Sequence, residues 1–305
     1  MASDIQAIWQ ATVTLSDGQA AAFADFMEQE SVGVSVFEAE PQGWTITALY
    51  RGRPDQGRLE AGLALIAAAE SAPEPALDLR PLPSADWLAE AYAGFPARRI
   101  GRFYVHGSHI ATPPPGGPIA LKIDAAIAFG SGEHATTEGC LRALDEERQR
   151  RPQIARALDM GTGSGILAIA AAKLWPMAAI VAIDIDADSA RVAAANARLN
   201  QVGPRIRARH GEGYAAPLAR KGRRFDLIVS NILARPLMRM APSLAKRLAP
   251  GGTAVLSGLL VRQERAVLTA HEAAGLRLAA RRRIGGWSTL IVTRPRPLTR
   301  PPRKR

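Results

Sequence analysis

The chain has 305 residues, 47% of them hydrophobic and only 5% aromatic, which suits two packed domains with mainly aliphatic cores. Its single cysteine, Cys140, excludes an internal disulfide and fits a reducing compartment. The formal net charge is +11. Because the N-terminus has no signal-peptide pattern and the most apolar stretch, residues 154–184, is broken by glycine, lysine and proline, we expect a cytoplasmic protein without a membrane span.

Residues 1–82 are expected to fold in the order strand, helix, strand, strand, helix, strand. The strands are predicted at 5–15, 32–38, 43–50 and 76–82, and the helices at 17–30 and 55–71. This order is typical of a small α+β, ferredoxin-like domain. The segment has no histidine, cysteine or glycine-rich loop, so we predict that it binds a partner and carries no catalytic group.

Residues 83–118 are expected to link this domain to a second one. They contain a predicted short helix around 87–92, a predicted strand over 101–109 and a proline-rich loop over 111–118. From residue 119 onward, segments typical of strands alternate with segments typical of helices as far as residue 292. This alternation predicts an α/β domain with a mostly parallel sheet over 119–294.

The strongest chemical signal is the segment ALDMGTGSGILAIAAAKL at 157–174. It predicts an apolar strand ending at Asp159, a tight turn, and an alanine-rich helix that begins near residue 166. The turn has three glycines, Gly161, Gly163 and Gly165. A glycine turn at the carboxyl end of a strand lets a ligand approach the backbone, and open α/β sheets bind their ligands at this edge. The dinucleotide fingerprint G-x-G-x-x-G, starting at Gly161, would need its third glycine at position 166, where the chain has isoleucine.

Two polar residues are predicted at the ends of neighbouring strands. Asp184 ends the next strand, where a carboxylate can accept hydrogen bonds from both ribose hydroxyls of a nucleoside. Its alternative role is to cap the following helix. Asn231 ends the fourth strand, 225–233, and its amide offers a donor and an acceptor to an incoming amine. Its alternative role is that of an ordinary turn residue.

The glycine turn with its preceding acid resembles the first motif of the Rossmann-like methyltransferases that use S-adenosylmethionine. The segment AIAFGSGEHATTEGC at 126–140 resembles the AFGTGxHxTT signature of the PrmA family, the ribosomal protein L11 methyltransferases, with Ser131 in place of the usual threonine. Asn231 within NILA also fits that family. The resemblance implies a small recognition domain, a linker, and a mostly parallel seven-stranded sheet with helices on both faces and an antiparallel final strand.

The resemblance also implies which residues bind the cofactor S-adenosylmethionine. The direct contacts would be Thr137, Gly161, Asp184 and Asn231. The pocket would further include Phe129, Gly130 and Gly163. Thr136 and Thr137 have an alternative role as caps of the helix that begins there. His134 lies in the signature, and its role stays open, since the five histidines are scattered without metal-ligand spacing.

By the same resemblance, the activity is the methylation of the α-amine and of lysine ε-amines of ribosomal protein L11. We expect Asn231 to orient a neutral amine, with no dedicated general base. Three alternatives remain: a methyltransferase acting on lysines of another protein, an RNA methyltransferase, and a non-catalytic ribosome-assembly factor that keeps the fold.

The basic, proline-rich tail at 295–305 is expected to be disordered, and six of the basic residues fall in the last twelve positions. One interpretation is a solvated terminus. The other is a weak, sequence-independent contact with RNA. We further expect a monomer whose partner is ribosomal protein L11, either free or on the ribosome.

Overall fold

The computed structural model describes residues 8–15, 20–29, 31, 33–38, 43–81, 97–108, 110, 117–124, 135–220, 222 and 224–296. The chain forms two compact units, residues 1–92 and 93–305, each with its own core. The short helix expected around 87–92 and the tail from residue 297 lie outside the described residues.

The first unit is a four-stranded antiparallel sheet with two helices. Its elements are β1 (Ile8–Leu15), α1 (Ala20–Met27), β2 (Gly33–Glu38), β3 (Trp44–Arg51), α2 (Gln56–Ala69) and β4 (Leu77–Pro81). The spatial order β2-β3-β1-β4 confirms the predicted ferredoxin-like arrangement. Alternate residues of β1 and β3 are buried against Phe23, Leu59 and Leu63 of the helices, as the period of two in a half-buried strand requires.

The second unit is built on a seven-stranded sheet of order β10-β9-β8-β11-β12-β14-β13. The strands are β8 (Arg156–Met160), β9 (Ala179–Asp184), β10 (Ile206–His210), β11 (Phe225–Asn231), β12 (Leu248–Leu260), β13 (Arg277–Ile284) and β14 (Trp287–Thr293). The final strand, β14, runs opposite to the other six, so its pairs with β12 and β13 are antiparallel and the remaining pairs are parallel. The predicted mostly parallel sheet with an antiparallel last strand is therefore confirmed.

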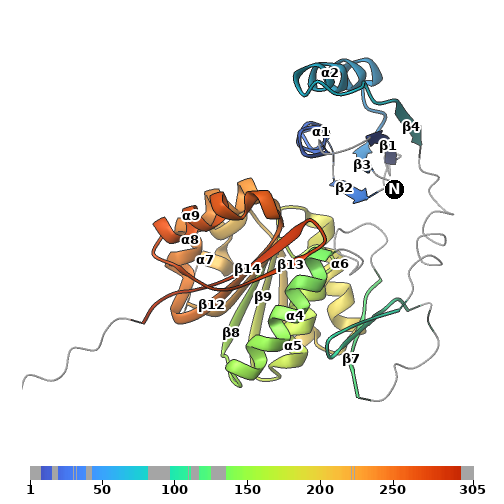
Figure 1. The fold of residues 1–305 in the computed structure, drawn as a ribbon. Helices are drawn as coiled ribbons and strands as arrows, with labels where there is room; N and C mark the ends of the chain where they lie inside the picture. Colours follow the sequence, from blue (N-terminus) through green and yellow to red (C-terminus); the bar gives the residue numbers. More distant parts are fainter. Residues whose placement is uncertain are drawn as a thin grey trace, which may run out of the picture. The chain divides into compact units, whose positions relative to one another are not determined.

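Helices cover both faces of this sheet (Figure 1). One face carries α4 (Ala135–Arg150), α5 (Ile166–Leu174) and α6 (Ala187–Leu199). The other carries the short α7 (Pro217–Arg220), α8 (Ala234–Arg247) and α9 (Glu264–Ala273). The result is the three-layer arrangement of a doubly wound α/β domain.

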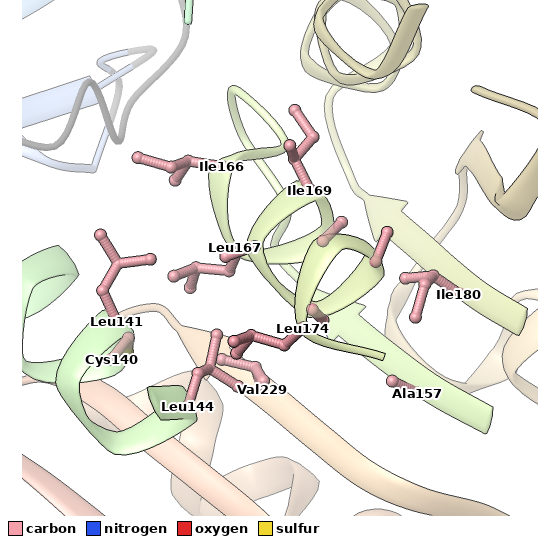
Figure 2. Close-up of a cluster of buried hydrophobic side chains, with 14 of the residues drawn as sticks. Cys140, Leu141, Leu144, Ala157, Ile166, Leu167, Ile169, Leu174, Ile180 and Val229 are labelled. Atoms are coloured by element: carbon pink, nitrogen blue, oxygen red, sulfur yellow. The ribbon is translucent and has the colours of Figure 1, made fainter. Parts of the chain in front are cut away.

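Helix α5 lies almost completely buried in the core of the second unit. Every residue of α5 except Lys173 is buried, because the helix lies between the sheet, α4 and α6. Figure 2 shows Cys140, Leu141 and Leu144 of α4 facing the helix, with side chains of β8, β9 and β11 completing the cluster. Cys140 is 0% exposed.

A separate small sheet packs against the helices α4 and α5 of the second unit. It consists of β5 (Arg98–Ile100), β6 (Phe103–His106) and β7 (Ile119–Lys122), in the order β5-β6-β7. Its apolar residues, among them Phe103 and Leu121, join the core formed by α4 and α5. None of the helices in the described part of the chain has both the length and the apolar character needed to cross a bilayer.

Candidate functional site

The residues singled out from the sequence meet at one edge of the large sheet. Because β8, β9 and β11 are parallel, their carboxyl ends lie side by side. The register pairs Met160 of β8 with Ile183 on one side and with Ser230 on the other. Asp184 and Asn231, one residue further along, therefore stand on either side of the turn that follows β8.

That turn, residues 161–165, is held by backbone hydrogen bonds. Gly161 and Thr162 both donate to the carbonyl of Ile183, at 2.8 and 3.1 Å. Gly161 has φ +74°, in the left-handed region, and a Cβ there would come 2.2 Å from Cγ2 of Ile232. Only glycine allows both this backbone conformation and the close approach of the segment that follows β11.

Asp184 is bonded to the glycine turn through its side chain. Its Oδ2 accepts from the N–H of Gly163 at 2.8 Å and its Oδ1 accepts from the N–H of Asp186 at 3.0 Å. The N-cap of α6 is Asp186, whose carboxylate accepts from Ser189 at 2.8 Å. The alternative that Asp184 caps this helix is therefore wrong. Partial burial raises the pKa of Asp184, with backbone hydrogen bonds from Asp186, Gly163 and Ile185 acting in the opposite direction.

Asp159 is buried beneath the turn, at 2% exposure. Its Oδ2 accepts from the hydroxyl of Thr162 at 2.7 Å and from the N–H of Ala168 at 3.0 Å, so it caps α5 from a neighbouring strand. The N-cap residue itself, Gly165, has no side chain with which to do so. Burial raises the pKa of Asp159 to about 7, despite the two hydrogen bonds and with a further contribution from the charge of Asp184.

Asn231 reaches from β11 to the start of α4. Its Nδ2 lies 3.4 Å from Oγ1 of Thr136 and 3.3 Å from Oγ1 of Thr137, long hydrogen bonds to two buried hydroxyls. Because α4 begins at Ala135, both threonines lie inside its first turn and not at the N-cap position. Asn231 is thus tied to another element, and its alternative role as a simple turn residue is not favoured.

The backbone beside Asn231 is fixed by β12. The N–H of Ile232 donates to the carbonyl of Ser257 at 3.1 Å. The next residue, Gly258, has φ +84°, and a Cβ there would come 2.4 Å from the carbonyl oxygen of Ile232. Ile232 therefore lies closely packed between Gly161 and Gly258. This packing fixes the position of the backbone at Asn231, from which the side chain extends.

The structure brings together Gly163 with Asp184, and Thr137 with Asn231. Phe129, Gly130 and His134 lie outside the described residues. The sequence did not indicate the capping role of Asp159, or Ser257, whose hydroxyl bonds the Thr136 carbonyl at 3.2 Å and Oγ1 of Thr289 at 2.9 Å. No local pattern could have found Ser257, because its partners are far away in the chain.

The chain is similar to known proteins over most of its length. The model of a family described as ribosomal protein L11 methyltransferase (PrmA) matches residues 6–295. The ribosomal protein L11 methyltransferase of Bradyrhizobium diazoefficiens is 42% identical over 260 residues, which cover 85% of this chain and 86% of that one. The protein of the same name from Rhizobium meliloti is 40% identical over 288 residues, covering 92% and 98%. Among solved structures, the ribosomal protein L11 methylase of Lactobacillus delbrueckii subsp. bulgaricus gives a TM-score of 0.57 at 29% identity, covering 66% of this chain and 100% of that one.

Proposed function

We propose that the chain, which belongs to the ribosomal protein L11 methyltransferase (PrmA) family, transfers methyl groups from S-adenosylmethionine to the α-amine and lysine ε-amines of ribosomal protein L11. The observation that carries the proposal is the meeting of the glycine turn, Asp184 and Asn231 at one sheet edge, in a chain whose family match spans both units. Membership of this family makes the chain an S-adenosylmethionine-dependent protein methyltransferase.

The residues at this edge fit a nucleoside cofactor. The two oxygens of Asp184 accept from backbone N–H groups, and a carboxylate has lone pairs enough to accept from ribose hydroxyls as well. Ile185, next to it, is 72% exposed, so it offers apolar surface to a nucleobase. We propose that Gly161 and Gly163 give the backbone close access to the cofactor, with Thr137 and Asn231 as further contacts. Phe129 and Gly130 stay a prediction from the family resemblance.

When bound, S-adenosylmethionine supplies a methyl group on a positively charged sulfur, which an amine attacks without further activation of the carbon. The contribution of the chain is to align a neutral amine with that group. Among the described residues, the side chains that hydrogen-bond the Asn231 amide nitrogen are those of Thr136 and Thr137, whose hydroxyls do not ionise. Asn231 therefore orients the amine as a neutral donor and acceptor, and the amine loses its proton before transfer.

The recognition and partner assignments extend this proposal. Residues 1–82 recognise the substrate, residues 83–118 link them to the methyltransferase domain at 119–294, and the enzyme acts as a cytoplasmic monomer on free or ribosome-bound ribosomal protein L11. The tail at 295–305 adds a weak contact with RNA through its basic residues. Removing residues 297–305 would then raise KM for ribosomes at low salt and leave KM for the free protein unchanged.

Incubation of the full chain with S-adenosylmethionine and purified, RNA-free ribosomal protein L11 tests the function. Mass spectrometry should show 14-Da additions, roughly the mass of one methylene group, at the N-terminus and at lysines. The same assay with ribosomal RNA and with the other large-subunit proteins should show no transfer. Methylation of RNA alone, or of a different protein, would assign the activity to one of the alternatives.

A further inference from the structure

Asn196 of α6 and Asn200, the C-cap of the same helix, stand one helical turn apart and are buried, at 1% and 7% exposure. Buried amide groups need hydrogen-bond partners, and both side chains have them. Most of these partners are backbone groups outside α6. They belong to Lys122 of β7, to Asp124 two residues after β7, and to the glycine turn.

Asn200 substitutes for a neighbouring strand along the edge of β7. Its Oδ1 accepts from the N–H of Lys122 at 3.0 Å, and its Nδ2 donates to the carbonyl of Lys122 at 2.6 Å. On its other edge, β7 pairs with β6. The side chain of Asn200 thus makes the two hydrogen bonds that a strand residue would make there.

Asn196 continues this pairing and adds a second connection. Its Oδ1 accepts from the N–H of Asp124 at 3.1 Å, and its Nδ2 donates to the carbonyl of Ser164 in the glycine turn at 2.8 Å. Four residues of a helix rise ~6 Å and two residues of a strand span ~6.6 Å, so the asparagine spacing matches that of Lys122 and Asp124. Of the two asparagines, Asn196 is the one whose side chain joins the segment after β7 to the glycine turn.

Both segments that Asn196 joins belong to the methyl-donor site. Ser164 follows Gly163, whose N–H donates to the carboxylate of Asp184. Asp124 is itself anchored, because its carboxylate accepts from the N–H of Ser108 at 2.7 Å and from the Ser108 hydroxyl. It also lies two residues before the segment at 126–140, which contains Phe129 and Gly130.

We propose that Asn196 is a positioning residue for the methyl donor, which holds the glycine turn and Asp124 in a fixed relation. The inference rests on the proposed function and concerns the same site. Asn196 does not touch the reacting atoms. It acts through the Ser164 carbonyl on the turn, and through the Asp124 N–H on the chain just before the signature segment.

The test uses the full chain with Asn196→Ala, and with Asn200→Ala as a matched control. Isothermal titration with S-adenosylmethionine alone measures donor affinity, and steady-state rates give KM separately for the donor and for ribosomal protein L11. We expect Asn196→Ala to raise Kd and KM for the donor about ten-fold, as the loss of one buried hydrogen-bonded link suggests, with KM for the protein within about two-fold. Both variants should lower Tm by similar amounts. Asn200→Ala should keep the Kd for S-adenosylmethionine within about two-fold of the wild type.

A second variant covers the case in which Asn196→Ala does not fold. Asn196→Asp has the same size and keeps an acceptor for Asp124, but it cannot donate to Ser164, so donor affinity should still fall. Donor affinity within two-fold of the wild type in both Asn196 variants would overturn the inference. So would an equal loss in Asn200→Ala, since the role would then be structural. Failure of the wild-type chain to bind S-adenosylmethionine would overturn the proposed function as well, and so the two failures are distinguishable.

Discussion

Asp184 has two tasks at one carboxylate, since each of its oxygens holds a backbone N–H while lone pairs remain for a ligand. Replacing it with asparagine keeps the shape, but one of the two backbone donors then faces an NH₂ group instead of an acceptor. We predict that Asp184→Asn raises the Kd for S-adenosylmethionine by at least about ten-fold, because hydrogen bonds to a charged acceptor are worth about 1.5–3 kcal/mol. Calorimetric titration measures this. An unchanged Kd would show that the carboxylate does not contact the donor.

Gly258 packs against the backbone of Ile232, the residue that follows Asn231, and so affects the position of Asn231. A methyl group there would meet the backbone of Ile232 at 2.4 Å, so the chain beside Asn231 has to move. We predict that Gly258→Ala lowers kcat at least about ten-fold, because displacements of about 1 Å at a site of this kind are costly.

Gly275→Ala is the control for Gly258→Ala. Gly275 has a similar φ of +87°, but nothing lies within 4 Å of its added Cβ. It should therefore lose about 1 kcal/mol of stability through backbone strain alone and keep full activity. Equal kinetic losses in the two variants would mean that backbone strain, and not displacement of Ile232, is the cause.

At the scale of elements, the edge strand β13 is fastened to the start of α9 by one carboxylate. Glu264 is 6% exposed and accepts from Nε of Arg283 at 2.8 Å, from Arg281 at 3.3 Å and from the hydroxyl of Ser288 at 2.7 Å. These partners, the Arg283 hydrogen bond first, lower the pKa of Glu264 to about 2 against the effect of its burial. The strand, the helix and β14 therefore share one ionic contact.

The pH dependence of this contact follows from that lowered pKa. The stabilisation is fully present above the ordinary glutamate pKa, near 4.5, and is lost as the pH falls toward 2. We predict that Glu264→Gln lowers the free energy of unfolding by about 2 kcal/mol at pH 7, and that its difference from the wild type shrinks between pH 5 and 2. Urea unfolding at several pH values measures both. Glu272→Gln, exposed on the same helix, should change stability by less than about 0.5 kcal/mol, and a pH-independent difference for Glu264→Gln would contradict the assignment.

Elements with local signals were predictable from the sequence. Helix α2 was expected at 55–71 and runs from Gln56 to Ala69, because Asp55 is a local N-cap that accepts from the N–H of Arg58 at 3.0 Å. Strand β13 was not identified separately. Its inward positions include Arg282, which pairs with Glu146 of α4, so the usual alternation of apolar and polar residues is interrupted.

The candidate site was predictable only one strand end at a time. The glycine turn and Asp184 each have a local signal at the end of a predicted strand, and the structure places them in contact although they are 21 positions apart. The link between Asn231 and Thr137 spans 94 positions, and that between Asp124 and Asn196 spans 72. Such contacts depend on how the sheet and its helices assemble, which no local pattern encodes.

At the scale of the whole molecule, each compact unit has a core of its own, so the second can be tested without the first. We predict that a fragment of residues 93–305 binds S-adenosylmethionine with a Kd within about three-fold of the full chain, because the residues proposed to hold it all lie in this unit. Methylation of ribosomal protein L11 should fall at least about a hundred-fold, since substrate recognition is assigned to the removed part. Full activity of the fragment would show that residues 1–92 do not select the substrate.

Because Cys140 is buried, the rate at which its thiol reacts measures local unfolding around α4. Cys140 is the only thiol in the sequence, lies on the buried face of α4, and has its pKa raised by burial. Since thiolates and not thiols attack disulfide reagents, labelling by such a reagent counts the molecules in which α4 has left the sheet. The first turn of that same helix holds the hydroxyls that face Asn231. Addition of the methyl donor should therefore slow the labelling, and by more the lower its Kd.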